Sequence, residues 1–192
     1  MITLVAFLRK KPDFNGFLEE DVKIKPVSNN NSDKTYEWFP INRKKPSVSI
    51  SASDKKSYYS AYSNFIFSSI NKDIPQWLIN KISKTNGFLI ADEEMYRIFQ
   101  KYPRLENLLK VEEPLWEVLK FTKGKPTYFV SLETKLYPEK GVLNGMCNLA
   151  KYFSGVYDGL VWNEETKKFE ADGNKLYDFY CKAYELAISK KI

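Results

Sequence analysis

Residues 86–94 read NGFLIADEE, and residues 158–165 read DGLVWNEE. Both segments place an Asn-Gly or Asp-Gly turn pair before a short apolar run, and both end on acidic residues. Each one also follows a helical segment, which is itself preceded by a strand-like segment, Phe65–Ile70 in the first case and Tyr128–Glu133 in the second. The sequence therefore predicts two copies of a strand, helix and strand unit.

Two such units predict an α+β fold of ferredoxin-like type, in which two crossover helices cover one face of a mainly antiparallel sheet. The sheet would hold Phe88–Ala91 and Leu160–Trp162 beside the strands that precede the helices. We expect Leu78 and Leu149 to be buried where these helices pack on the sheet. N-terminal strands would widen the sheet, and they are predicted at Ile2–Leu8, Thr35–Phe39 and Ser47–Ala52. Extra helices are predicted in the middle of the chain and at its C-terminus.

Particular residues define some of these helices. Asp92 is expected to be the N-cap of a helix with Glu93 and Glu94 in its first turn, and Pro103 to end that helix. Trp77 is expected on the buried face of the helix that also holds Leu78, and Phe179 on the buried face of the C-terminal helix.

A simpler explanation of the two matching segments is local turn chemistry. Asn-Gly and Asp-Gly supply the left-handed turn between a helix and a strand, and acidic residues favour the start of whatever helix follows. Two unrelated turns would then contain the same residue types for local reasons alone. The test is whether Phe88–Ala91 and Leu160–Trp162 lie in one sheet.

Length and composition predict a single α+β domain over residues 1–192. Hydrophobic residues make up 43% of the 192 positions, which is enough for one continuous core. The apolar stretch Ile2–Leu8 is too short for a secretory signal, and its basic residues follow it instead of preceding it. No segment approaches the roughly 20 apolar residues of a membrane span. We therefore expect a soluble cytoplasmic protein.

Histidine is absent, and this excludes whole classes of site. Ser/His/Asp triads, Cys/His dyads and histidine-based zinc or iron sites all require it. Two cysteines far apart, Cys147 and Cys181, suggest neither a disulfide framework nor a metal knuckle. The formal charge of +6 arises from 30 basic and 24 acidic residues that are interspersed, so it favours acidic partners only weakly. We expect no cofactor and no bound metal.

Acidic residues at the ends of the two matching segments are the candidate binding site. If the two units share a sheet, these carboxylates gather at one edge, where they would receive a basic protein partner or, through oxygen ligands, a divalent cation. The site residues are Asp92, Glu93, Glu94 and Asp158. An alternative is a carboxylate-based or metal-assisted enzyme, in which these groups and the pair Glu112 and Glu113 divide acid and base roles. No phosphate-binding loop, dinucleotide turn or nucleophile elbow is present to support catalysis.

A second alternative is a basic nucleic-acid-binding protein. Cations with nearby aromatic rings bind phosphates and stack bases. This pattern occurs at Lys55, Lys56, Tyr58, Tyr59 and Tyr62, shortly after Arg43, Lys44 and Lys45. Tyrosines at such spacing are also typical of a half-buried sheet face. The basic residues form no block of a single sign, which makes nucleic acid the less favoured partner.

The C-terminal part of the chain carries a resemblance to a known class. A helix, then Gly155, Val156, Tyr157 and Asp158, and then the strand Leu160–Trp162 resemble the C-terminal portion of some bacterial toxin immunity proteins. The resemblance implies a small, cytoplasmic, non-enzymatic protein that neutralises a cognate toxin by covering its active site. Together with the missing catalytic motifs, it predicts a non-catalytic protein-binding protein whose partner is another protein.

Overall fold

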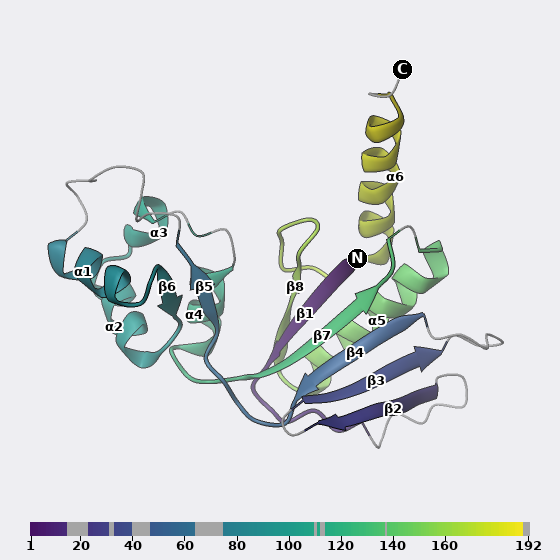
Figure 1. The fold of residues 1–192 in the computed structure, drawn as a ribbon, viewed down its shortest axis with the longest axis horizontal. Coiled ribbons are helices and arrows are strands. Elements are labelled where there is room, and N and C mark those ends of the chain that lie inside the picture. The colour runs from purple at the N-terminus through teal and green to yellow at the C-terminus, as the bar shows by residue number, and fades with distance from the viewer. Residues whose placement is uncertain are drawn as a thin grey trace. The chain divides into compact units, whose positions relative to one another are not determined.

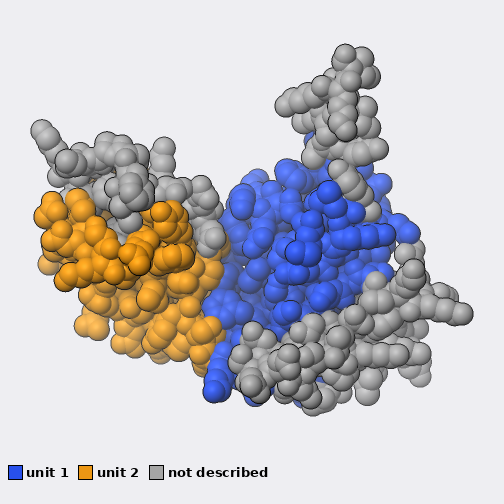
Figure 2. Space-filling model, viewed as in Figure 1, with its two compact units in different colours: residues 1–55, 128–192 blue, residues 56–127 orange. Residues whose placement is uncertain are grey.

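The computed structural model describes residues 1–14, 23–30, 33–39, 47–63, 75–109, 111, 114–136 and 138–189. It divides the chain into two compact units, shown in separate colours in Figure 2. Unit 1 comprises residues 1–55 and 128–192, and unit 2 comprises residues 56–127. Unit 2 is therefore an insertion between two segments of unit 1.

Unit 1 is built on a mainly antiparallel sheet. Its strands are β1 (Ile2–Leu8), β2 (Lys23–Asn30), β3 (Asp33–Phe39), β4 (Val48–Ser53), β7 (Tyr128–Thr134) and β8 (Gly159–Asn163). Among the described residues these six strands form one sheet in the order β2-β3-β4-β7-β1-β8, and each neighbouring pair is antiparallel (Figure 1). Its helices are α5 (Lys140–Val156) and α6 (Gly173–Ser189).

The core of unit 1 lies between this sheet and α5. Side chains alternate along β1, so that Ile2, Leu4, Ala6 and Leu8 all point into the same core. The buried face of α5 supplies Val142, Leu143, Met146, Cys147, Leu149, Ala150 and Phe153. Because β7 and β8 flank β1 and both run antiparallel to it, they are parallel to each other, and α5 is the connection between them. This strand, helix and strand unit was predicted from the sequence.

Unit 2 has a smaller sheet and more helix. It contains β5 (Ser60–Tyr62), α1 (Gln76–Lys84), β6 (Phe88–Ile90), α2 (Glu93–Lys101), α3 (Leu105–Leu108) and α4 (Leu115–Thr122). β5 and β6 pair antiparallel in a two-stranded sheet. Their inward residues, Ala61 and Leu89, join a buried cluster with Leu78 of α1, Met95 of α2 and Leu119 of α4. A two-stranded sheet is only marginally stable alone, so this cluster is what holds it.

The prediction that the two matching segments share a sheet is wrong. β8 lies in the sheet of unit 1, whereas β6 pairs with β5 in unit 2. The helices predicted to pack on one face are likewise in separate cores: Leu149 belongs to the core of unit 1 and Leu78 to that of unit 2, although both leucines are buried as expected. The ferredoxin-like pair of units is therefore not formed. The predicted strand Phe65–Ile70 lies outside the described residues.

Local turn chemistry accounts for the shared letters. Asn86 and Gly87 both adopt the left-handed conformation, with φ of 52° and 89°. In the second segment only Asp158 does so, with φ of 53°, and Gly159 is already part of β8. The acidic ends differ as well, since Glu93 and Glu94 open α2 while Glu164 and Glu165 lie in a turn. The two segments are alike in sequence but not in structural role.

Some of the remaining predictions are confirmed and others are wrong. The three N-terminal strands are confirmed, and β2 was not predicted. We expected one continuous core, but the buried side chains form two clusters, one in each unit. Trp77 and Phe179 were expected in buried helix faces, yet 43% and 41% of their surfaces are exposed. The prediction of a single α+β domain over residues 1–192 stays a prediction. Within the described ranges, every helix is too short or too polar to cross a membrane.

Candidate functional site

Asp92 serves the start of α2. Its backbone is extended, and its carboxylate accepts a hydrogen bond from the Met95 backbone N–H at 2.8 Å, which makes it an N-cap as predicted. The turn after α4 packs directly against it: a Cβ added at Gly124 would lie 2.6 Å from the Asp92 carbonyl oxygen. Asp92 is half-buried in this arrangement. Its carboxylate is therefore committed to the local fold.

Glu94, on the first turn of α2, forms an ion pair with Lys81 of α1. The hydrogen bond and charge of Lys81 lower the pKa of the Glu94 carboxyl. Glu93 is exposed on the same turn. Negative charge at this end of a helix is favoured by the helix dipole, so both glutamates also help α2 to form.

Asp158 belongs to unit 1, in the turn that leads from α5 into β8. The Arg9 guanidinium Nη1 lies 3.2 Å from each of its carboxylate oxygens, and the Arg9 backbone N–H donates to the Asp158 carbonyl at 3.1 Å. These contacts extend the β1–β8 pairing by one residue. Because both side chains are well exposed, the ion pair adds little to stability.

The four predicted site residues are not brought together as one site. Asp92, Glu93 and Glu94 are in unit 2 and Asp158 is in unit 1. Within the part of the chain that the structure describes, no three Asp, Glu or Cys side chains gather closely enough to hold a metal ion. Glu112 and Glu113, the other acids of the enzyme alternative, lie outside the described residues. The role of the acidic residues in protein binding stays a prediction.

The basic and aromatic stretch of the nucleic-acid alternative is divided too. Arg43, Lys44 and Lys45 lie outside the described residues. Tyr59 packs against the core of unit 2, whereas Tyr58 and Tyr62 are exposed. Of the two exposed rings, Tyr62 lies in β5, opposite Phe88 of β6.

The outer face of the β5–β6 sheet carries large apolar side chains. Tyr62, Phe88 and Ile90 are 37%, 49% and 41% exposed, and we call these three residues the apolar face. Tyr62 and Phe88 are directly opposite in the strand register, and their ring centroids are 5.5 Å apart in an edge-to-face arrangement. The pleat forces this exposure, because Ala61 and Leu89 between them point into the core.

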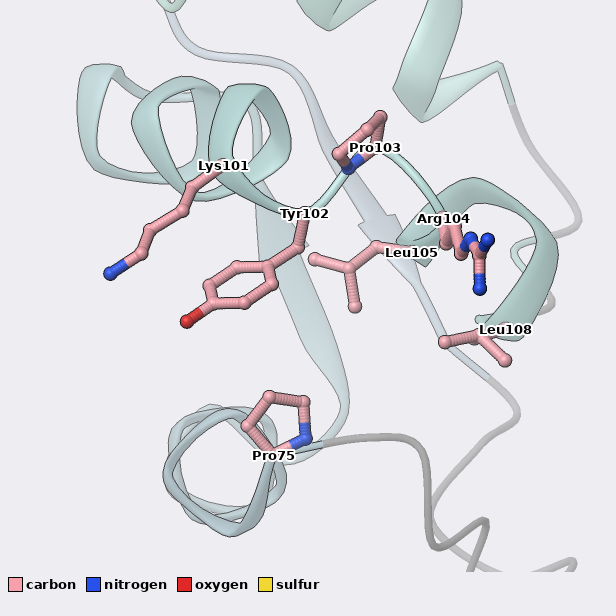
Figure 3. Close-up of a pocket in the computed structure, with 7 residues that line it drawn as sticks. All are labelled: Pro75, Lys101, Tyr102, Pro103, Arg104, Leu105 and Leu108. Carbon is pink, nitrogen blue, oxygen red and sulfur yellow. The ribbon is translucent and has the colours of Figure 1, made fainter.

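A pocket of about 500 Å³ opens at the turn between α2 and α3. Figure 3 shows Tyr102 and Leu105 directed into the space above Pro75, with Lys101 at one end and Arg104 and Leu108 at the other. The described lining consists of Pro75, Lys101, Tyr102, Pro103, Arg104, Leu105 and Leu108. Leu105 is fully buried and forms part of the floor, while Lys101 and Arg104 are exposed.

Sequence reasoning missed both surfaces. The run Phe88–Ile90 is apolar at every position, so no alternation marks which side chains face outward. Pro103 was interpreted only as the end of α2, although it follows Lys101 and Tyr102 and precedes Arg104. The usable signal was the combination of two cations, a tyrosine and a proline in four successive residues.

Comparison with models of known families, with curated proteins and with solved structures found no match. The fold and its surfaces define a two-unit α+β protein whose unit 2 carries an exposed apolar face and a basic pocket.

Proposed function

We propose that this chain is a non-catalytic protein-binding protein that contacts its partner through the apolar face of Tyr62, Phe88 and Ile90. An antiparallel sheet with one face on the core normally presents polar residues on the other. Here Ser60 is the polar residue among the outward positions of β5 and β6, and the other three are large and apolar. This departure from the usual pattern is the observation that carries the proposal.

The chemistry of the face suits a protein partner. Aromatic side chains are the commonest anchors of protein interfaces, because they bury a large area with few rotatable bonds. The edge-to-face contact between Tyr62 and Phe88 holds both rings in place before binding. Less side-chain entropy is then lost when a partner covers them.

The narrower proposal is an immunity or inhibitor protein that acts in the cytoplasm on a bacterial toxin. It is supported by the resemblance at Gly155–Asp158 and Leu160–Trp162 and by the lack of a catalytic motif in a chain without histidine. In this proposal the partner is the toxin itself, and binding blocks its active site. The contribution of Asp92, Glu93, Glu94 and Asp158 to partner binding stays a prediction. Among them, Glu93 is exposed in the same unit as the apolar face, and charge at the rim of an interface mainly affects association rate and specificity.

The test is affinity capture from the native cell with the full chain, read by mass spectrometry. We expect a stoichiometric protein partner that is lost with the double variant Phe88→Thr and Ile90→Thr. Threonine keeps the strand propensity of these positions while removing most of their apolar surface. The matched control is Leu136→Thr, because Leu136 is 47% exposed but lies in unit 1.

Circular dichroism of each variant must match the parent, so that loss of capture is not loss of folding. A partner that remains bound to the double variant would refute the role of the apolar face. Capture of nucleic acid alone would overturn the proposed function and support the basic nucleic-acid alternative instead.

A further inference from the structure

We propose that the pocket at the α2–α3 turn binds an acidic segment of the protein partner. An apolar side chain of that segment would enter the space over Pro75, between Tyr102 and Leu108, while flanking carboxylates meet Arg104 and Lys101. This inference rests on the proposed function, since it takes the partner to be a protein. It concerns a site formed by residues other than the apolar face.

The pocket has the build of a recognition site for a short segment. Its volume of about 500 Å³ lies within the range of ligand pockets and exceeds what a single side chain fills. Tyr102, Leu105 and Leu108 supply its apolar surface, and Figure 3 shows these three side chains lining the space above Pro75. Pro75 and Pro103 each fix their own backbone φ angle in this lining.

Charge decides which segment fits. Lys101 and Arg104 line the pocket, and none of the seven lining residues that the structure describes is acidic. Pro75 immediately precedes α1, whose first turn lacks an acidic residue, so the positive end of the helix dipole also borders the pocket. Carboxylates are the groups that guanidinium and ammonium side chains bind best.

Two other cations of unit 2 are already paired with carboxylates. Lys120 lies 2.8 Å from a carboxylate oxygen of Glu106, and Lys81 is paired with Glu94. Arg104, by contrast, forms no ion pair within the described ranges, and Lys101 makes only a cation–π contact, 5.5 Å from the Tyr102 ring centroid. Both cations are therefore available to a ligand. Lys84, Lys123 and Lys125 also form no ion pair in the described part of unit 2, but they are not among the described lining residues, so position at the pocket is what distinguishes Lys101 and Arg104.

An exposed aromatic ring stands beside the site. The Trp77 ring centroid is 6.2 Å from that of Tyr102, and Trp77 is 43% exposed although it was expected in the core. A tryptophan at this position extends the apolar surface beyond Tyr102. In this proposal the Trp77 ring would also contact the residues of the partner segment that flank the inserted side chain.

The probe is a phage-displayed library of random seven-residue peptides, selected on the immobilised full chain and then made as labelled synthetic peptides. We expect enriched peptides to combine aspartate or glutamate with a large apolar residue. Arg104→Gln should weaken the binding of such a peptide about tenfold, which corresponds to about 1.4 kcal/mol. Lys101→Gln should weaken it about threefold, and both effects should shrink as salt rises because the charges are exposed.

The matched control is Lys125→Gln, which removes an exposed cation of unit 2 that is not among the described lining residues. It should leave peptide affinity unchanged. The inference is overturned if no peptide is enriched, if enriched peptides are not acidic, or if Arg104→Gln and Lys125→Gln have equal effects. The double variant Phe88→Thr and Ile90→Thr should still bind the peptide. A captured partner that stays bound to this double variant would reject the apolar face and leave the pocket inference standing.

Discussion

Gly159→Ala should destabilise the protein, although no unusual backbone angle requires glycine there. Gly159 begins β8 and pairs with Leu8 of the central strand β1. A Cβ at this position would lie 2.5 Å from the Leu8 Cδ2 and 2.6 Å from the Phe7 carbonyl oxygen. The leucine side chain can rotate away, but the carbonyl belongs to a backbone that is hydrogen-bonded on both sides. The free-energy cost of the substitution therefore comes from displacing the β1 backbone within the sheet.

The magnitude follows from that displacement. Ordinary contact begins near 3.4 Å, so the Phe7 carbonyl must retreat by about 0.8 Å from 2.6 Å. Overpacking of this kind costs about 1–3 kcal/mol. Replacing glycine in a strand restores about 0.5–1 kcal/mol of backbone entropy. We expect a net loss of about 1 kcal/mol, and at most about 2.5 kcal/mol, in the free energy of unfolding, measured by urea denaturation.

Gly155→Ala is the matched control with the opposite sign. Gly155 lies in the last turn of α5, and an added Cβ would meet nothing within 4 Å. Alanine is a better helix former, so this change should raise the free energy of unfolding by about 0.5–1 kcal/mol. If Gly159→Ala stabilised the protein as Gly155→Ala does, the steric argument at the β1–β8 pair would be refuted.

Three further outcomes are expected. Leu149→Ala and Leu78→Ala should each lower the free energy of unfolding by about 2–5 kcal/mol, because each leucine is buried in its own core. If the chain is a single domain, circular dichroism and tryptophan fluorescence should report one coincident unfolding transition for each variant. Separate transitions would overturn the single-domain prediction. The pKa of Glu94 is lowered by Lys81, so the stability of their ion pair is present above the ordinary value of 4.5 and is lost as pH falls through the lowered pKa. Glu94→Gln should remove that part of the acid dependence, worth at most about 1 kcal/mol because the glutamate side chain is exposed. An unchanged acid profile would contradict the pairing. Burial raises the pKa of the Cys147 thiol to about 11, so iodoacetamide should alkylate it much more slowly than it alkylates Cys181. The two rates are followed by mass spectrometry. Equal rates would show that the core around α5 opens readily.

Local elements could be predicted from the amino-acid sequence alone. An apolar run stopped by charges marked β1, and alternation with serine marked β4. Asp92 was identified as an N-cap from its position before two glutamates, and Asn86-Gly87 as a left-handed turn from its residue types. These features depend on neighbours within a few residues, which is why a single sequence carries them.

The way in which those elements combine depends on tertiary contacts. The residues of Phe88–Ile90 do not indicate whether this strand pairs with β5 or joins the larger sheet, because strand pairing depends on residues far away in the chain. The same lack of alternation hid which side chains form the apolar face. The acidic residues chosen as a site followed from the predicted shared sheet, and they separated into two units when that sheet did not form. Gly159 was predicted as a turn residue, but the approach of the β1 backbone is what requires it.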